Sequence, residues 1–261
     1  MSEREEMLER IRRALGRSKG SVPSAPSYAS EEWPPAGQPI MPLIAPADLV
    51  GAFEAEWRKV GGLPYRASAP QEFDEVVRAI LRSCGATAAV LSRNPLLSRL
   101  RLADRLTAWG TPAAVWTAPE PPRAERADCE SSPQQNAVDS AGAEQAFREQ
   151  CFAATVGITG VDFVLAESGS MVLTSLTEGS QLASLAPPVH VALYRRAQMV
   201  ASLEEVLETN AIARSGMTSQ GRSVILITGT SRTADIEQVL IRGVHGPREV
   251  HAVLVEESCL G

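Results

Sequence analysis

Apolar side chains recur every three or four positions in the first half of the chain, which is the spacing of one helix face. The positions are Leu49, Phe53, Trp57 and Val60, stopped by Gly61–Gly62, and then Phe73, Val76, Val77, Ile80 and Leu81. Apolar or β-branched runs at 86–91 and 113–117 predict strands on either side of a helix at about 96–109. This alternation of helix and strand is typical of a parallel sheet.

Strand-like runs continue in the second half, at 161–166, 171–174 and 224–227. The first two are separated by a short link that contains Gly169, which predicts a hairpin or sharp turn. The run at 224–227 has no polar position, as expected for a strand of a parallel sheet that is covered on both faces. We therefore predict an α/β domain with an open, mainly parallel sheet and helices on both faces.

A polar turn follows the run at 224–227, before helical spacing resumes. In an open α/β sheet, ligands bind at the carboxyl edge, where glycine permits close backbone approach and the first N–H groups of a helix attract an anion. Hydroxyl groups and Arg232 add donors, and Asp235 either orients Arg232 or faces the helix dipole. The other interpretation is that the hydroxyls only cap the helix. The candidate ligand-binding residues are Gly229, Thr230, Ser231, Arg232, Thr233 and Asp235.

The link Glu167–Ser168–Gly169–Ser170 forms a second candidate group. Burial near a sheet edge would raise the pKa of Glu167 and suit it to general acid or base catalysis, whereas hydrogen bonds from Ser168 or Ser170 would keep it ionised. The alternative is an ordinary acidic turn, in which Glu beside Ser and Gly has no catalytic part.

Three histidines are dispersed along the chain. His245 stands in Gly-Val-His-Gly-Pro between a predicted helix and a strand, where it is a candidate base or hydrogen-bond donor, or simply shapes the turn. In a strictly parallel sheet it would lie at the edge opposite the 228–233 turn. His190 and His251 start or sit in apolar strands and are expected to be core residues, so the histidines offer no metal-ligand spacing.

The chain divides into an arm at 1–20, a Pro-rich linker at 21–45 and a domain at 46–261, with a probable loop insertion at 118–140. Ser2 and Glu5 fit a capping box at the start of the arm. Its apolar stripe is formed by Met7, Leu8, Ile11 and Leu15. A lone helix of this length needs a surface to dock on, either its own domain or another subunit, so the arm allows a homo-oligomer.

Composition narrows the classes of partner. The chain has 261 residues, 44% of them hydrophobic, and a net charge of −6 with scattered basic residues, which argues against nucleic-acid binding. We expect a cytoplasmic protein, because neither a signal peptide nor a run of roughly 20 apolar residues is visible. The cysteines, Cys84, Cys129, Cys151 and Cys259, form no C-x-x-C pair. We therefore predict no metal and no cofactor in this chain.

Several blocks resemble, in order and spacing, the LUD domain, the fold unit of lactate-utilisation proteins. They are G-I-T-G-V-D-F-V-L-A-E-S-G-S-M-V-L at 157–173, L-A-S-L-A-P-P-V-H-V-A-L at 182–193, T-G-T-S-R-T-A-D-I-E at 228–237, G-V-H-G-P at 243–247 and V-H-A-V-L-V at 250–255. The charged start, ending in I-R-R-A-L-G at 11–16, is similar to the lactate-utilisation protein C branch. One departure is Thr230, where the family usually has Pro.

The resemblance implies a fold like that of sugar-phosphate isomerases, glucosamine-phosphate deaminases and CoA transferases. In the CoA transferases a Glu in an E-x-G motif accepts the acyl group, and E-S-G at 167–169 is similar. The family implies a cluster-free subunit of a cytoplasmic iron–sulfur system that oxidises L-lactate to pyruvate, which binds a small anionic metabolite or organises its partners. The chain lacks the G-x-G-x-x-G dinucleotide fingerprint, so electron carriers are expected on iron–sulfur partner subunits. The alternatives are a stand-alone enzyme acting on an anionic metabolite and a non-catalytic scaffold.

Overall fold

A computed structural model of the protein describes residues 44–117, 133–208, 223–234 and 240–260, together with Met7 and Arg10. The chain forms two compact units, Met1–Pro42 and Leu43–Gly261. In the first unit only Met7 and Arg10 are described, both in helical conformation. The rest of the predicted arm and most of the predicted linker lie outside the described residues.

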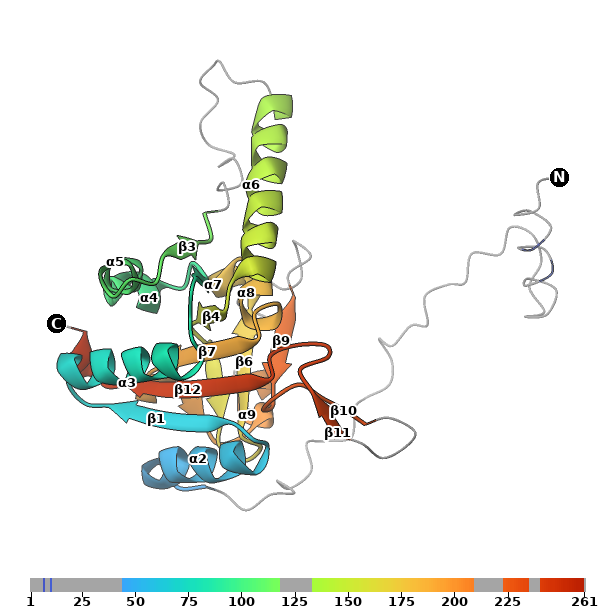
Figure 1. Ribbon diagram of the computed structural model, residues 1–261. Helices are drawn as coiled ribbons and strands as arrows, with labels where there is room; N and C mark the ends of the chain where they lie inside the picture. The colour runs from blue at the N-terminus through green and yellow to red at the C-terminus, as the bar shows by residue number, and fades with distance from the viewer. Residues whose placement is uncertain are drawn as a thin grey trace. The chain divides into compact units, whose positions relative to one another are not determined.

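The second unit is built on a six-stranded sheet in which all neighbouring strands are parallel (Figure 1). From one edge to the other the strands are β1 (Leu63–Ala67), β12 (Glu249–Val255), β7 (Val189–Tyr194), β4 (Val156–Thr159), β2 (Ala89–Leu91) and β3 (Ala113–Val115). The central strands β7 and β12 are buried along almost their whole length. The prediction of an open parallel sheet is therefore confirmed.

Helices cover both faces of this sheet. On one face lie α3 (Pro70–Ser83), α4 (Pro95–Arg99) and α5 (Leu102–Ala108), whose apolar residues pack against Leu91, Ile158 and Val191. The other face receives α2 (Leu49–Lys59), α6 (Pro133–Ala153) and α8 (Leu182–Leu185). The short elements are α7 (Ser175–Glu178), α9 (Leu203–Glu208) and the 3-10 helices η2 (Pro46–Asp48), η3 (Arg196–Gln198) and η4 (Glu257–Cys259).

The predicted helices at 49–60 and 73–81 correspond to α2 and α3, whereas the single helix expected at 96–109 is two. The break falls at Arg101, the residue before α5, whose backbone is left-handed with φ of 49°. The expected loop at 118–140 also differs, because residues 133–140 form the first turns of α6. No apolar stripe marks these turns in the sequence, although Pro133 suits a first helical position.

A second sheet of four strands packs beside α2 on the same face of the main sheet. Its strands, in order, are β8 (Met199–Val200), β5 (Phe163–Leu165), β6 (Ser170–Thr174) and β9 (Val224–Ile227). The predicted hairpin is confirmed as the antiparallel pair β5–β6. Placing 224–227 in the parallel sheet is wrong, because β9 pairs antiparallel with β6. An apolar run does not by itself distinguish the two environments, and Leu226 is 49% exposed.

The sequence predicted that a helix begins directly after the 228–233 turn, but the structure shows a strand at that point. Residues Arg232–Ala234 form β10, which pairs antiparallel with β11 (Leu240–Arg242). This two-stranded ribbon connects β9 to the loop before β12. The first N–H groups of a helix are therefore not available to an anion at Arg232 and Thr233.

Candidate functional site

The predicted turn at Gly229–Thr233 lies at the amino end of β12, not at the carboxyl edge of the parallel sheet. Ser231 N donates to Pro247 O at 3.0 Å, and Gly243 N donates to Ser231 O at 3.0 Å. Gly229 has φ of 79°, and a Cβ at this position would lie 2.3 Å from Val60 O. Close approach to the end of α2 therefore explains this glycine.

Arg232 lies at the start of β10 and is directed toward the loop between α2 and β1. Its Nε donates to Thr230 Oγ1 at 3.4 Å, and a Cβ on Gly61 would lie 2.6 Å from Arg232 Nη2. Thr230 is buried, whereas Thr233 belongs to the β10–β11 ribbon. Asp235 lies outside the described residues, so its predicted contact with Arg232 stays a prediction.

The carboxylate of Glu167 is bound by the backbone of α9. Glu167 Oε1 accepts a hydrogen bond from Leu203 N at 3.0 Å, and Glu167 N donates to Ala201 O at 3.0 Å. This capping contact satisfies one of the N–H groups that a helix start leaves unpaired. The structure thus gives Glu167 a structural contact, and its catalytic role stays a prediction.

The serines of the same hairpin turn contact the other predicted group, the 228–233 turn. Ser168 Oγ donates to Ser170 Oγ at 2.9 Å, and Ser170 Oγ lies 2.7 Å from Thr228 Oγ1. Gly169 has φ of 61°, and a Cβ there would lie 2.6 Å from Trp57 N. The hydroxyls therefore connect the hairpin turn to the start of the 228–233 turn. The C-terminal end of α2 packs against Gly169 of the first turn and Gly229 of the second.

His245 lies in the loop before β12, next to Ser231, because the β10–β11 ribbon returns the chain to that position. The expectation that His245 and the 228–233 turn occupy opposite edges is therefore wrong. His245 is exposed and lines a shallow groove of about 370 Å³ with apolar residues that include Phe152, Leu185 and Val244. The predicted residues thus gather at the amino edge, with Glu167 directed elsewhere.

The order of the parallel strands reverses direction between β2 and β4. After β2 the chain moves outward to β3, then returns to β4 and continues through β7 to β12. Open α/β sheets bind ligands at the carboxyl ends of the strands at such a switch point. In this structure Ser92 follows β2 and Gly160 follows β4. The side chain that lies between these two ends belongs to Glu178 of α7.

Glu178 is 1% exposed and accepts hydrogen bonds from four groups. Its Oε2 accepts from Ser92 Oγ at 2.5 Å and from Gly160 N at 3.0 Å. Its Oε1 accepts from Asn94 Nδ2, and the Thr177 hydroxyl lies 3.3 Å away. Burial raises the pKa of Glu178, and these hydrogen bonds oppose the rise. We call Glu178 with its donors Ser92, Asn94 and Gly160 the Glu178 hub.

A second acid, the half-buried Asp162, lies beside the Glu178 hub. Asp162 Oδ2 accepts from Thr174 N at 2.7 Å, and the Thr177 hydroxyl lies 3.0 Å from the same carboxylate. Burial raises the pKa of Asp162 as well, and its negative charge contributes to the raised pKa of Glu178. Two acids with raised pKa values at a switch point indicate a candidate functional site, although ion networks with only a structural role can produce the same pattern.

A cavity of about 390 Å³ lies next to the Glu178 hub. It is lined by Trp116 after β3, by Glu144, Gln145 and Arg148 of α6, and by Gly179, Ser180 and Leu182 after α7. A Cβ on Gly179 would lie 2.1 Å from Trp116 Cδ1, so the indole ring packs directly on this glycine. The lining combines an aromatic wall, polar groups and one cation, as ligand pockets commonly do. We call it the Arg148 cavity.

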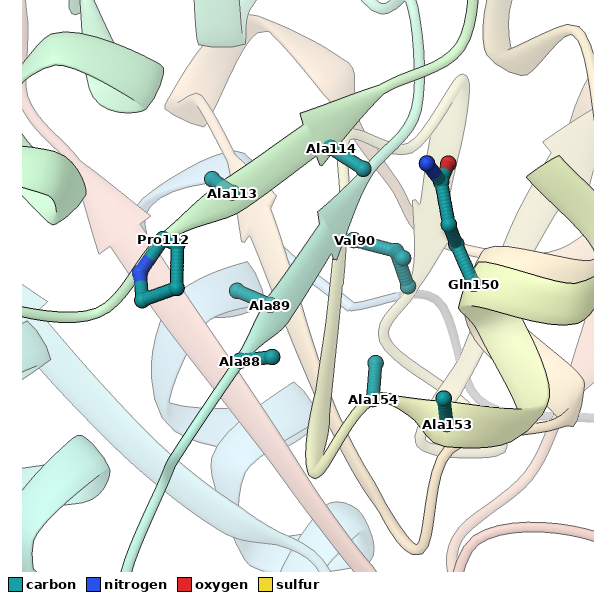
Figure 2. A pocket seen from close by; sticks show the side chains of 9 residues that line it. All are labelled: Ala88, Ala89, Val90, Pro112, Ala113, Ala114, Gln150, Ala153 and Ala154. Atoms are coloured by element: carbon teal, nitrogen blue, oxygen red, sulfur yellow. The ribbon is translucent and has the colours of Figure 1, made fainter. Parts of the chain in front are cut away.

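Another cavity, of about 290 Å³, lies between β2, β3 and the end of α6 (Figure 2). Figure 2 shows that its lining is almost entirely alanine, with Val90 and Pro112, and that Gln150 is its one polar side chain. Among the residues that the structure describes, no charged side chain lines it. This cavity can accept apolar groups but cannot neutralise an anion.

Sequence reasoning missed the Glu178 hub and Asp162. One local signal was present, since Glu178 precedes Gly179 shortly after the apolar strand β6, much as Glu167 follows β5. Asn94 before Pro95 is a helix-start signal, and Asn94 Oδ1 does cap α4 by accepting from Leu96 N at 2.9 Å. What the pattern does not contain is the strand order that brings these residues together.

Burial makes the described thiols harder to ionise. Cys84, Cys151 and Cys259 are unpaired, and burial raises the pKa of Cys151 to about 11. A thiolate is the form that binds iron or zinc, and burial disfavours it. Within the described ranges, no three His, Cys, Asp or Glu side chains converge as a ligand set.

The two histidines of the apolar strands, His190 and His251, are core residues. His190 is buried, with its Nε2 2.9 Å from Thr159 Oγ1, and burial lowers its pKa to about 3, as expected for a core residue. His251 is also buried in β12. Of the helices the structure describes, none combines the length and apolar character that crossing a membrane requires.

Comparison with known proteins identifies the family. A family model described as the LUD domain matches residues 50–255. Uncharacterized protein YkgG of Escherichia coli is 30% identical over 189 residues, which is 70% of each chain. Lactate utilization protein C of Exiguobacterium sp. is 37% identical over 114 residues, 43% of this chain and 49% of the relative. Lactate utilization protein C of Bacillus subtilis is 33% identical over 104 residues, which is 40% of this chain and 43% of the relative.

The matched segments thus span less than half the length of these lactate utilization proteins. A crystal structure of a DUF162 family protein from Deinococcus radiodurans has a TM-score of 0.50 and 19% identity, and the match covers 82% of this chain and 99% of that chain. At this identity the likeness concerns the fold alone. Because the family model matches most of the chain, and a relative at 30% identity is matched over 70% of its length, the chain belongs to the LUD-domain family.

Proposed function

We propose that this protein acts in L-lactate utilisation, as a cytoplasmic subunit of a system that oxidises lactate to pyruvate. The observation that carries the proposal is the LUD-domain match over residues 50–255, together with several relatives named Lactate utilization protein C. The fold supports a binding role, because its switch point holds the buried Glu178 and the half-buried Asp162 beside a polar cavity.

Oxidation of lactate to pyruvate releases two electrons and two protons, so an electron acceptor must take part. In our proposal the electrons pass to iron–sulfur clusters on partner subunits. The four cysteines of this chain are dispersed without a C-x-x-C pair, which is unlike the clustered spacing of iron–sulfur ligands. The chain then contributes substrate binding or organisation of the complex.

A stand-alone enzyme acting on an anionic metabolite is a second candidate, which one observation favours. Glu178 is buried at the switch point and burial raises its pKa, which is a common property of carboxyl groups that act as general acids or bases. In this alternative the purified chain turns over a sugar phosphate or acyl-CoA without partners.

The test is deletion of the gene and growth on L-lactate as sole carbon source, with growth on glucose as the control. We expect the deletion to abolish growth on L-lactate only, and expression of the wild-type chain to restore it. Affinity purification of the restoring chain should recover proteins that carry iron–sulfur absorbance. Unimpaired growth on L-lactate in a strain with no second lactate oxidase contradicts the proposal, and turnover by the isolated chain favours the stand-alone enzyme.

A further inference from the structure

We propose that the Arg148 cavity binds a small 2-hydroxycarboxylate. The identity of this ligand rests on the proposed function, whereas the location rests on the structure. The cavity lies at the same end of the molecule as the Glu178 hub, since Gly179 and Ser180, which line it, directly follow Glu178 in the chain.

One acid, Glu144, and one cation, Arg148, line the cavity, and the cation can hold a carboxylate. Arg148 is the one cation in the lining, its Cζ lies 5.9 Å from the Phe152 ring centroid, and it forms no ion pair with any carboxylate in the described part of the chain. Glu149, its neighbour on α6, is instead engaged by Gln145 Nε2 at 2.9 Å. The guanidinium therefore has all its donors available, and a carboxylate can receive two parallel hydrogen bonds from it.

The remaining polar groups favour a ligand with a hydroxyl next to its carboxylate. Glu144 also lines the cavity, one helical turn before Arg148, and offers an acceptor for an O–H donor. Ser180 Oγ accepts from Leu182 N at 3.3 Å, which leaves its own proton free to donate. A 2-hydroxy acid can satisfy Arg148 with its carboxylate and Glu144 with its hydroxyl, whereas a plain carboxylate has no hydroxyl to donate to Glu144.

The wall of the cavity matches the apolar part of such a ligand. Trp116 and Leu182 present aromatic and aliphatic surface. The Nε1 of Trp116 is buried, lies against Gly179 and has no hydrogen-bond partner among the described residues. The alanine-lined cavity of Figure 2 is the alternative location, but the described residues that line it include no cation to hold a carboxylate. The geometry thus selects the Arg148 cavity for an anion.

The experiment is titration of the full-length purified chain with sodium L-lactate by isothermal calorimetry at low ionic strength, with propionate as the ligand that lacks the hydroxyl. Arg148→Gln is the test variant, and Arg82→Gln, an exposed arginine on α3, is the matched control. Circular dichroism confirms that both variants are folded. We expect Arg148→Gln to raise the Kd for L-lactate about tenfold or more, since it removes hydrogen bonds to a charged group. Arg82→Gln should leave Kd within about twofold of wild type.

L-lactate should also bind more tightly than propionate, and phosphate should not compete at equal concentration. Equal Kd values for wild type and Arg148→Gln, equal binding of L-lactate and propionate, or no saturable binding of L-lactate by wild type would each overturn the inference. These failures are separate from failure of the proposed function, which is decided by the growth of the deletion strain.

Discussion

Replacement of Glu178 by Ala should destabilise the protein severely. The side chain accepts hydrogen bonds from Ser92 Oγ, Asn94 Nδ2 and Gly160 N, and these donors are buried with it. A buried donor without an acceptor costs about 1–3 kcal/mol, so losing three acceptor contacts predicts about 3–6 kcal/mol after partial relaxation. Domains are stable by only about 5–15 kcal/mol in total, so this loss is a large fraction.

Glu178→Gln should cost less, about 1–3 kcal/mol. The Gln amide keeps one carbonyl acceptor, but its NH₂ group must face either Asn94 Nδ2 or Gly160 N. Asn94 cannot reverse its own amide without loss, because its Oδ1 caps α4 through Leu96 N. One donor-to-donor contact is therefore unavoidable, and the expected order of stability is wild type, then Gln, then Ala.

The assay is urea unfolding followed by tryptophan fluorescence, with the midpoint and the slope m fitted for each variant. Glu75→Ala, at an exposed position on α3, is the matched control and should lie within about 0.5 kcal/mol of wild type. A Glu178→Ala variant as stable as Glu75→Ala would refute the claim that buried donors in the Glu178 hub depend on this carboxyl group.

Three further predictions concern Glu178, Glu167 and Gly229. Burial raises the pKa of Glu178 in the folded protein above its ordinary value of 4.5. The stability that this shift contributes is fully present below pH 4.5 and is lost as pH rises through the folded pKa, so the advantage of wild type over Glu178→Gln in urea should shrink as pH rises. Glu167→Ala should cost about 0.5–2 kcal/mol by removing the contact to α9, measured by urea unfolding, and a loss of growth on L-lactate without loss of stability would instead support a catalytic Glu167. Gly229→Ala should lower thermal stability by about 2–4 kcal/mol, because its Cβ would meet Val60 O at 2.3 Å with φ at 79°, and an unchanged melting temperature would contradict this.

Local spacing was sufficient for the elements that each bury one face. The stripe through Phe53 and Trp57 predicted α2, and both side chains are fully buried between the two sheets. The hairpin β5–β6 was predicted from the short link around Gly169, which has the positive φ that such a turn requires. In both cases the residues that determine the element lie within one short segment of the chain.

The position of the 228–233 turn depended on contacts between distant segments. Strand β9 reads as a buried parallel strand, but its partner is β6, and β10 pairs with β11 eight residues further along the chain. Hydroxyl residues before Asp235 resemble a helix start, and nothing local distinguishes that from the start of a strand ribbon. The sequence therefore predicted this turn at the carboxyl edge of the main sheet, whereas the structure places it at the amino edge.

The Glu178 hub depends on the order of strands across the sheet. Ser92, Gly160 and Glu178 are separated in sequence and meet only because β4 inserts beside β2. Ser92 and Gly160 each follow an apolar strand directly, so both were possible strand-end residues, whereas Glu178 ends the short helix α7. Their convergence is a property of the topology, which the spacing of hydrophobic residues does not encode.

The most direct test of the proposed role is L-lactate-dependent formation of pyruvate in extracts of the deletion strain, measured before and after adding back the purified chain. We expect little pyruvate without the chain and restored formation with it, provided that the iron–sulfur partners are present in the extract. Undiminished pyruvate formation in the deletion extract, with no other lactate oxidase in the strain, would contradict a role in L-lactate utilisation.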